Sequence, residues 1–103
     1  MKTKTIMAVL LGLAAQAALA APAPGVTIKD YKFAPETLKI GVGTTVTWTN
    51  KDADVHTVMS ATGLFVSGAL DTDDTYSYTF TKAGTYRIAC SLHPQMSETI
   101  VVE

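Results

Sequence analysis

Three side chains able to bind a metal follow one another at three-residue intervals near the end of the chain. They are Cys90, His93 and Met96, and Cys90 is the only cysteine in the sequence. A thiolate, an imidazole and a thioether together suit a soft transition metal, because Cys and Met favour copper(I) and imidazole also serves copper. Pro94 fixes its own φ and disfavours helical backbone at His93, so the turn should be short and stiff. The spacing therefore predicts a copper site in this segment.

The other histidine of the chain, His56, is the candidate for a fourth donor. It stands at the head of an apolar run, so a different strand has to carry it to residues 90–96. Two imidazoles, one thiolate and one weak thioether form the trigonal-plus-axial set of blue-copper electron-transfer sites. Such a set leaves no open coordination position, which argues against an enzyme with substrate chemistry at the metal.

The elements that must position these donors read as short β-strands. Runs with alternating apolar and polar residues are separated by turn residues such as Gly41, Gly84 and the segment 50–52. About seven to eight strands of this kind predict an all-β fold, a two-sheet antiparallel β-sandwich with Greek-key connections. Trp48 alternates with polar neighbours and is expected in the core. The predicted runs are Val26 to Phe33, Thr37 to Ile40, Thr44 to Thr49, His56 to Ser60, Thr75 to Thr81, Thr85 to Ala89 and Glu98 to Val102.

The first 20 residues have the organisation of a secretory signal peptide. Lys2 and Lys4 precede an apolar stretch, and Ala18-Leu19-Ala20 is a small-residue cleavage motif. We expect cleavage near Ala20 and one domain over residues 21–103, exported to a periplasm, with no membrane span. A small exported domain often relies on disulfides or a metal, and one cysteine cannot form an internal disulfide.

Composition excludes several other classes of function. The formal net charge is −1 at pH 7, and removal of Lys2 and Lys4 would make the chain more acidic. No basic run suggests nucleic acid, and no cationic amphipathic helix suggests a membrane surface. We expect a monomer whose partners are proteins.

Several stretches of the sequence resemble the cupredoxins, of the amicyanin, pseudoazurin and plastocyanin type. The resemblance spans Val26 to Glu103 and combines ligand spacing with the strands on either side. Its parts are Thr44 to Asn50, Asp54 to Val58, Gly84 to Cys90, His93 to Met96, and Ile100 to Val102.

The resemblance implies one copper ion in a type 1 site and a one-electron carrier that exchanges electrons with protein redox partners. His56, Cys90 and His93 would bind copper in the trigonal plane and Met96 on the axis. His93 would lie in an apolar surface patch that partners contact, with Pro94, Leu64, Phe65 and Met59 around it.

Two positions depart from the family pattern. Glu98 stands where relatives often have glycine, and a positive φ there would cost a non-glycine residue about 1 kcal/mol. Thr57 follows the first histidine where amicyanin-type relatives tend to have asparagine, and its hydroxyl or amide is expected to brace the copper loop.

Three other functions use the same residues. A copper carrier or buffer would bind the ion without redox turnover. A thiol enzyme would use His56 or His93 to activate Cys90. A structural zinc site would need different chemistry, because thioether is a poor zinc ligand.

Overall fold

The computed structural model describes residues 24–103, and the predicted signal peptide of residues 1–20 lies outside the described part. Eight strands make up its regular structure, and each predicted run overlaps at least one of them, although only residues 59–60 of the run His56 to Ser60 form a strand. Their bounds are β1 Gly25–Lys29, β2 Lys32–Ala34, β3 Thr37–Ile40, β4 Thr44–Asn50, β5 Met59–Ser60, β6 Thr75–Phe80, β7 Gly84–Ala89 and β8 Ser97–Val102.

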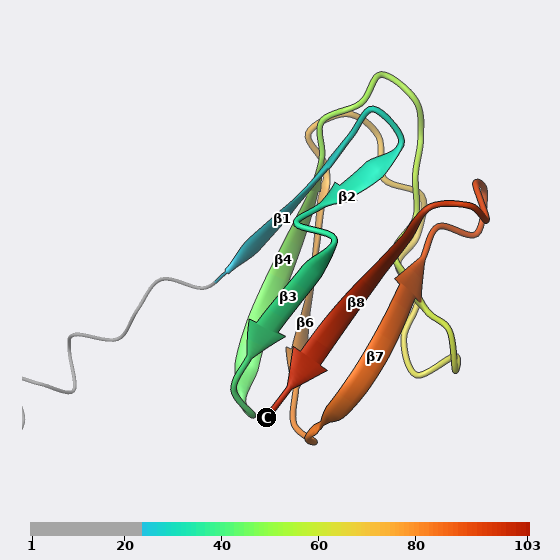
Figure 1. Ribbon diagram of the computed structural model, residues 1–103. Coiled ribbons are helices and arrows are strands. Elements are labelled where there is room, and N and C mark those ends of the chain that lie inside the picture. Colours follow the sequence, from blue (N-terminus) through green and yellow to red (C-terminus); the bar gives the residue numbers. More distant parts are fainter. Residues whose placement is uncertain (1–23) are drawn as a thin grey trace, which may run out of the picture.

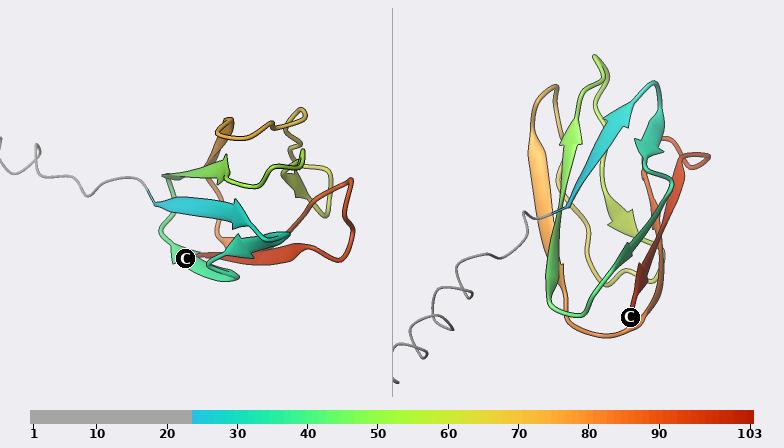
Figure 2. Two further views of the ribbon diagram at one scale, coloured as in Figure 1. Left: turned by 90° about the horizontal axis from the view of Figure 1, so that it is seen from above. Right: turned by 60° about the vertical axis from the view of Figure 1, so that its left-hand side comes forward.

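The strands form two four-stranded sheets packed face to face, as Figures 1 and 2 show. The strand order is β2-β1-β4-β6 in one sheet and β3-β8-β7-β5 in the other. The predicted sandwich is confirmed, but the prediction that both sheets are antiparallel is wrong. β1 pairs with β4 in parallel, and so does β3 with β8. The chain crosses from one sheet to the other between most consecutive strands. After such a crossover a strand can pair in parallel with an earlier strand, whereas a direct hairpin always gives an antiparallel pair.

The long run predicted from Val26 to Phe33 is in fact a hairpin. Lys29 pairs with Lys32, which leaves Asp30 and Tyr31 as a two-residue loop. Both have positive φ, 53° and 60°, the pattern of a type I′ turn, whose twist matches that of the flanking strands. Tyrosine is rare at positive φ, so the residues at this position did not predict a turn.

The core lies between the two sheets and follows the alternation seen in the sequence. Val46 and Trp48 of β4 are fully buried, and Ile88 and Ile100 of the facing sheet are equally buried. Trp48 lies 6.0 Å from Phe65 between ring centroids, within an aromatic cluster. The prediction of Trp48 as a core residue is therefore confirmed. This packing gives the loops at the ends of the sandwich a rigid base.

Candidate metal centre

The donors predicted from the sequence come together at one end of the sandwich. Cys90 directly follows β7 and Met96 directly precedes β8, so residues 90–96 connect these two strands (Figure 1). His56 arrives on the segment between β4 and β5, which a two-way backbone pair with Leu70 holds in place, at N···O distances of 3.2 and 2.8 Å. The site thus joins segments more than 30 residues apart in the sequence.

Three of the donor atoms converge on one point. His56 Nδ1 and His93 Nδ1 are 3.2 Å apart, and Cys90 Sγ lies 3.8 Å from the first and 3.6 Å from the second. Three donors at about 2.0 to 2.3 Å from an ion in their plane would be about 3.5 to 4.0 Å apart. The observed triangle therefore fits a single small ion with little change in side-chain position.

The loop that carries three of the predicted ligands folds back through two successive turns. The His93 amide donates to the Cys90 carbonyl at 3.2 Å, and the Met96 amide donates to the His93 carbonyl at 2.9 Å. This confirms the expected short turn around Pro94. Met96 is buried, with 2% of its surface exposed, and its role as the axial ligand stays a prediction.

The surroundings of the Cys90 thiol lower its pKa. It is fully buried, and burial alone raises its pKa, but hydrogen bonds to the sulfur outweigh this effect and lower the pKa to about 6. The strongest comes from the Thr57 backbone amide at 3.3 Å, and the two imidazoles and the Leu92 amide add to it. Because thiolate is the form that binds metals, the site presents its sulfur ready at neutral pH.

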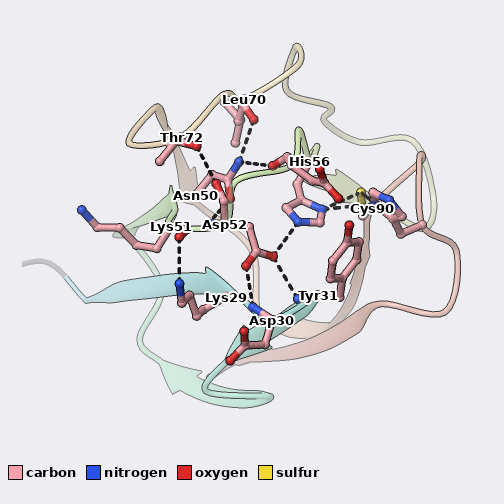
Figure 3. A network of polar contacts seen from close by, with 12 residues as sticks. Lys29, Asp30, Tyr31, Asn50, Lys51, Asp52, His56, Leu70, Thr72 and Cys90 are labelled. Carbon is pink, nitrogen blue, oxygen red and sulfur yellow. Dashed lines mark hydrogen bonds and ion pairs between the residues drawn. The ribbon is translucent and has the colours of Figure 1, made fainter.

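His56 is oriented by a buried carboxylate. Its Nε2 lies 2.8 Å from Asp52 Oδ2, and this leaves Nδ1 facing Cys90 and His93 (Figure 3). Asp52 also accepts the backbone amides of Asp30 and Tyr31, at 2.6 and 2.9 Å. A carboxylate on the far nitrogen fixes the ring orientation and makes the near nitrogen a better donor to a metal.

Comparison with known proteins shows the family to which the chain belongs. Residues 3–102 match the family model described as a cupredoxin-like domain. Amicyanin of Paracoccus denitrificans is 40% identical over 83 residues, which are 76% of this chain and 63% of that protein. Amicyanin-alpha of Methylorubrum extorquens is 34% identical over the full length of both chains. The structure of a mutant of amicyanin with Cu(I) matches with a TM-score of 0.75 and 36% identity, over 84% of this chain and 89% of the other. The chain belongs to the cupredoxin-like family.

The expectation that the hydroxyl or amide of Thr57 braces the metal loop is confirmed, although Thr57 departs from the family pattern. The Thr57 hydroxyl accepts the Ser91 amide at 2.8 Å and lies 2.9 Å from the Ser91 hydroxyl. Together with the bond from its own amide to Cys90, Thr57 ties the His56 segment to the first residues of the metal loop.

Two residues of this cupredoxin site escaped sequence reasoning. The Tyr31 ring lies 5.1 Å from the His56 ring and 4.8 Å from the His93 ring, nearly perpendicular to both. Asp52 carries the hydrogen bonds described above. Asp52 stands four residues before His56, which is a detectable signal, whereas Tyr31 lies in a run that reads as a strand.

Two of the residues predicted in the apolar patch around His93 lie elsewhere. Phe65 is 6% exposed and stacks on Tyr78, at 4.1 Å between ring centroids, so it belongs to the core. Leu64 is exposed, but it lines a cavity of about 140 Å³ with Lys82 and other residues beside the β6–β7 turn. That turn lies at the end of the cupredoxin domain opposite to residues 90–96 (Figure 1). Met59, in the edge strand β5, is half-buried and pairs with Ala89, so its place in the patch around His93 stays a prediction.

Glu98 has no strained backbone but an unusual environment. It lies within β8, and among residues 24–103 positive φ at non-glycine positions is limited to Asp30, Tyr31 and Asp73. The predicted backbone cost therefore does not arise. The side chain points into the core, where Trp48 Nε1 donates to Oε1 at 2.9 Å and Oε2 has no partner. Burial raises the pKa of the carboxyl to about 7, and the Trp48 hydrogen bond opposes only part of this rise.

Within residues 24–103 we find no helix of the length and apolarity that crossing a bilayer requires.

Proposed function

We propose that this cupredoxin binds one copper ion through His56, Cys90, His93 and Met96 and carries single electrons between protein redox partners. The observation that carries the proposal is the triangle of His56 Nδ1, His93 Nδ1 and Cys90 Sγ, with sides of 3.2 to 3.8 Å. The amicyanin structure with Cu(I), over which this chain matches at 36% identity, supports copper as the metal.

The donor set suits a metal that changes oxidation state in place. Bound copper would supply one-electron chemistry, since a trigonal set of two imidazoles and a thiolate with a weak axial thioether is the blue-copper arrangement. The protein's own part is to hold these donors still. Asp52 fixes His56, the Thr57 amide fixes the Cys90 sulfur, and the core buries Met96.

Rigidity favours an electron carrier over a copper carrier or buffer. A protein that passes copper on must release its ligands, and exposed, mobile donors serve that purpose best. Here His56 and Cys90 have no exposed surface, and only His93 is partly exposed. An ion held by such donors would dissociate slowly, whereas electron transfer requires only that a partner approach the outer edge of His93.

Burial of the thiol also argues against a thiol enzyme. Cys90 Sγ has both imidazoles within 3.8 Å, which could activate it, but the residue is 0% exposed and no substrate could reach the sulfur. We infer that the protein has no enzymatic activity of its own. Zinc is disfavoured because Met96 would contribute nothing to a zinc site.

We also infer that the protein acts outside the cytoplasm as a monomer. The support for export is the signal-peptide pattern of residues 1–20, and the support for a monomer is that the only cysteine is buried, so no disulfide can join two copies. Expression in a bacterium, periplasmic extraction and N-terminal sequencing test this inference. A mature chain that starts near Ala21 is expected, and a full-length chain in the cytoplasmic fraction would contradict export.

Visible absorption and electron paramagnetic resonance of the purified protein with copper(II) test the site. We expect an intense thiolate-to-copper band that is lost in Cys90→Ser. Met96→Leu should keep the band and change the reduction potential, because the axial ligand tunes the potential. Met59→Leu, in strand β5, is the matched control and should leave the potential unchanged. A colourless wild-type complex would refute the blue-copper assignment, and an unchanged potential in Met96→Leu would refute the axial role.

A further inference from the structure

The ring of Tyr31 covers both predicted histidine ligands from the side of the β1–β2 hairpin. It meets the His56 ring at 88° and the His93 ring at 89°, so one ring stands on edge against two imidazoles. His56 has no exposed surface, while Tyr31 is 40% exposed. On this side of the site Tyr31 is therefore the layer between the imidazoles and solvent, and Figure 3 shows its ring beside His56 and Cys90.

The backbone of Tyr31 is held in place by the same atom that orients His56. Asp52 Oδ2 accepts the Tyr31 amide at 2.9 Å and lies 2.8 Å from His56 Nε2. The other oxygen, Oδ1, accepts the Asp30 amide at 2.6 Å. Asp30 and Tyr31 both adopt left-handed backbone, which non-glycine residues keep only where surrounding contacts hold it. The hairpin, the carboxylate and the imidazole thus form one connected unit.

The carboxylate itself is anchored from the other direction. The Asp52 amide donates to Asn50 Oδ1 at 2.9 Å, and the Asp52 carbonyl accepts the Thr72 hydroxyl at 2.6 Å. Asn50 in turn donates to the carbonyls of Asp54 and Leu70. The Tyr31 backbone, from which the ring projects, is therefore held through Asp52 by this network.

We propose that Tyr31 is a positioning residue of the metal centre. Its ring holds the two imidazoles at their mutual angle and closes the β1–β2 side of the site to water and small anions. The aromatic ring does this, and the hydroxyl is dispensable, because within residues 24–103 that hydroxyl takes part in no hydrogen bond. The inference concerns the two imidazoles with or without metal, and only its copper readout rests on the proposed function.

The first test uses the metal-free protein and the rate at which diethyl pyrocarbonate modifies each histidine, followed by peptide mass spectrometry. Tyr31→Asn removes the ring, and asparagine adopts left-handed backbone readily. We expect it to speed modification of His56 at least about tenfold, a factor that corresponds to about 1.4 kcal/mol. Tyr31→Phe should react like wild type. Leu64→Asn, which removes a similarly exposed side chain at the opposite end, should also leave the His56 rate unchanged.

The second test uses the copper protein with azide as a small anionic probe. We expect azide to perturb the visible and paramagnetic spectra of Tyr31→Asn at concentrations about tenfold below those that affect wild type and Tyr31→Phe. This tenfold difference again corresponds to about 1.4 kcal/mol. Circular dichroism and thermal denaturation check that each variant folds, and Tyr31→Gly replaces Tyr31→Asn if the latter does not, because glycine adopts left-handed backbone without a steric penalty.

The outcomes separate this inference from the proposed function. Equal His56 rates in wild type and Tyr31→Asn would overturn the positioning role, whatever the copper spectra show. A Tyr31→Phe variant as reactive as Tyr31→Asn would overturn the assignment to the ring. Faster His56 modification in a protein that forms no coloured copper complex would support Tyr31 and count against the proposed function.

Discussion

Replacing Glu98 with glutamine should abolish one pH dependence of stability in the metal-free protein. Glu98 is 2% exposed, its Oε2 has no partner, and burial raises its pKa from 4.5 to about 7. A group that binds its proton more tightly in the folded state adds stability that is complete below its unfolded pKa. This contribution is lost as the pH rises through the folded pKa, so the window runs from about 4.5 to about 7.

The size of the loss follows from the two pKa values. A rise from 4.5 to about 7 corresponds to about 3 kcal/mol at 1.36 kcal/mol per pH unit. Little solvent reaches the carboxyl to screen it, so most of this value should be observed. Glutamine has nearly the same shape, can accept the Trp48 hydrogen bond through its amide oxygen, and carries no charge at any pH.

Urea denaturation at a series of pH values between 4 and 8 measures the effect. The free energy of unfolding of Glu98→Gln minus that of wild type should rise by about 3 kcal/mol from pH 4 to pH 8. Glu36→Gln, at an exposed position, is the control and should show no such rise. A difference between Glu98→Gln and wild type that stays constant across this range would refute the raised pKa.

Three further predictions concern the surroundings of the metal centre. In the metal-free protein, thiolate absorbance of Cys90 should appear with a midpoint near pH 6, because hydrogen bonds lower its pKa to about 6, and a midpoint near 9 would contradict those bonds. Asp52→Ala should lower the free energy of unfolding by about 2 to 4 kcal/mol, because two backbone amides and the buried His56 Nε2 lose their acceptor, and chemical denaturation at pH 7 measures this loss. Thr57→Val should release the Ser91 amide and loosen the metal loop, seen as faster amide hydrogen exchange at Ser91, whereas Thr57→Ser should retain the protection.

The strands and the convergence of three predicted donors were accessible from the sequence because each depends on local pattern. Alternation indicated β4 and β6, since a half-buried strand repeats every two residues. Cys90 and His93 lie close in the chain, so spacing alone could show that they reach one ion. His56 was found by elimination from a chain with two histidines. The distances between these donors are consistent with that prediction.

The pairing of the strands and the surroundings of the donors could not be predicted from local sequence patterns. The parallel partners of β1 and β3 depend on where the chain re-enters each sheet, which no local pattern records. The cupredoxin resemblance implied a patch around His93 in which Leu64 and Phe65 were expected. The fold instead turns Phe65 into the core and places Leu64 at the far end.

By itself, the sequence determined which atoms could bind the metal, because ligand chemistry belongs to side chains and their spacing. Only the tertiary structure decided what surrounds those atoms. Tyr31 reaches the imidazoles because Asp52, 21 positions away, bonds its amide, and Glu98 meets Trp48 across 50 positions of sequence. The physical reason is that packing and burial, which set ring positions and pKa values, arise from contacts between segments that are remote in the chain.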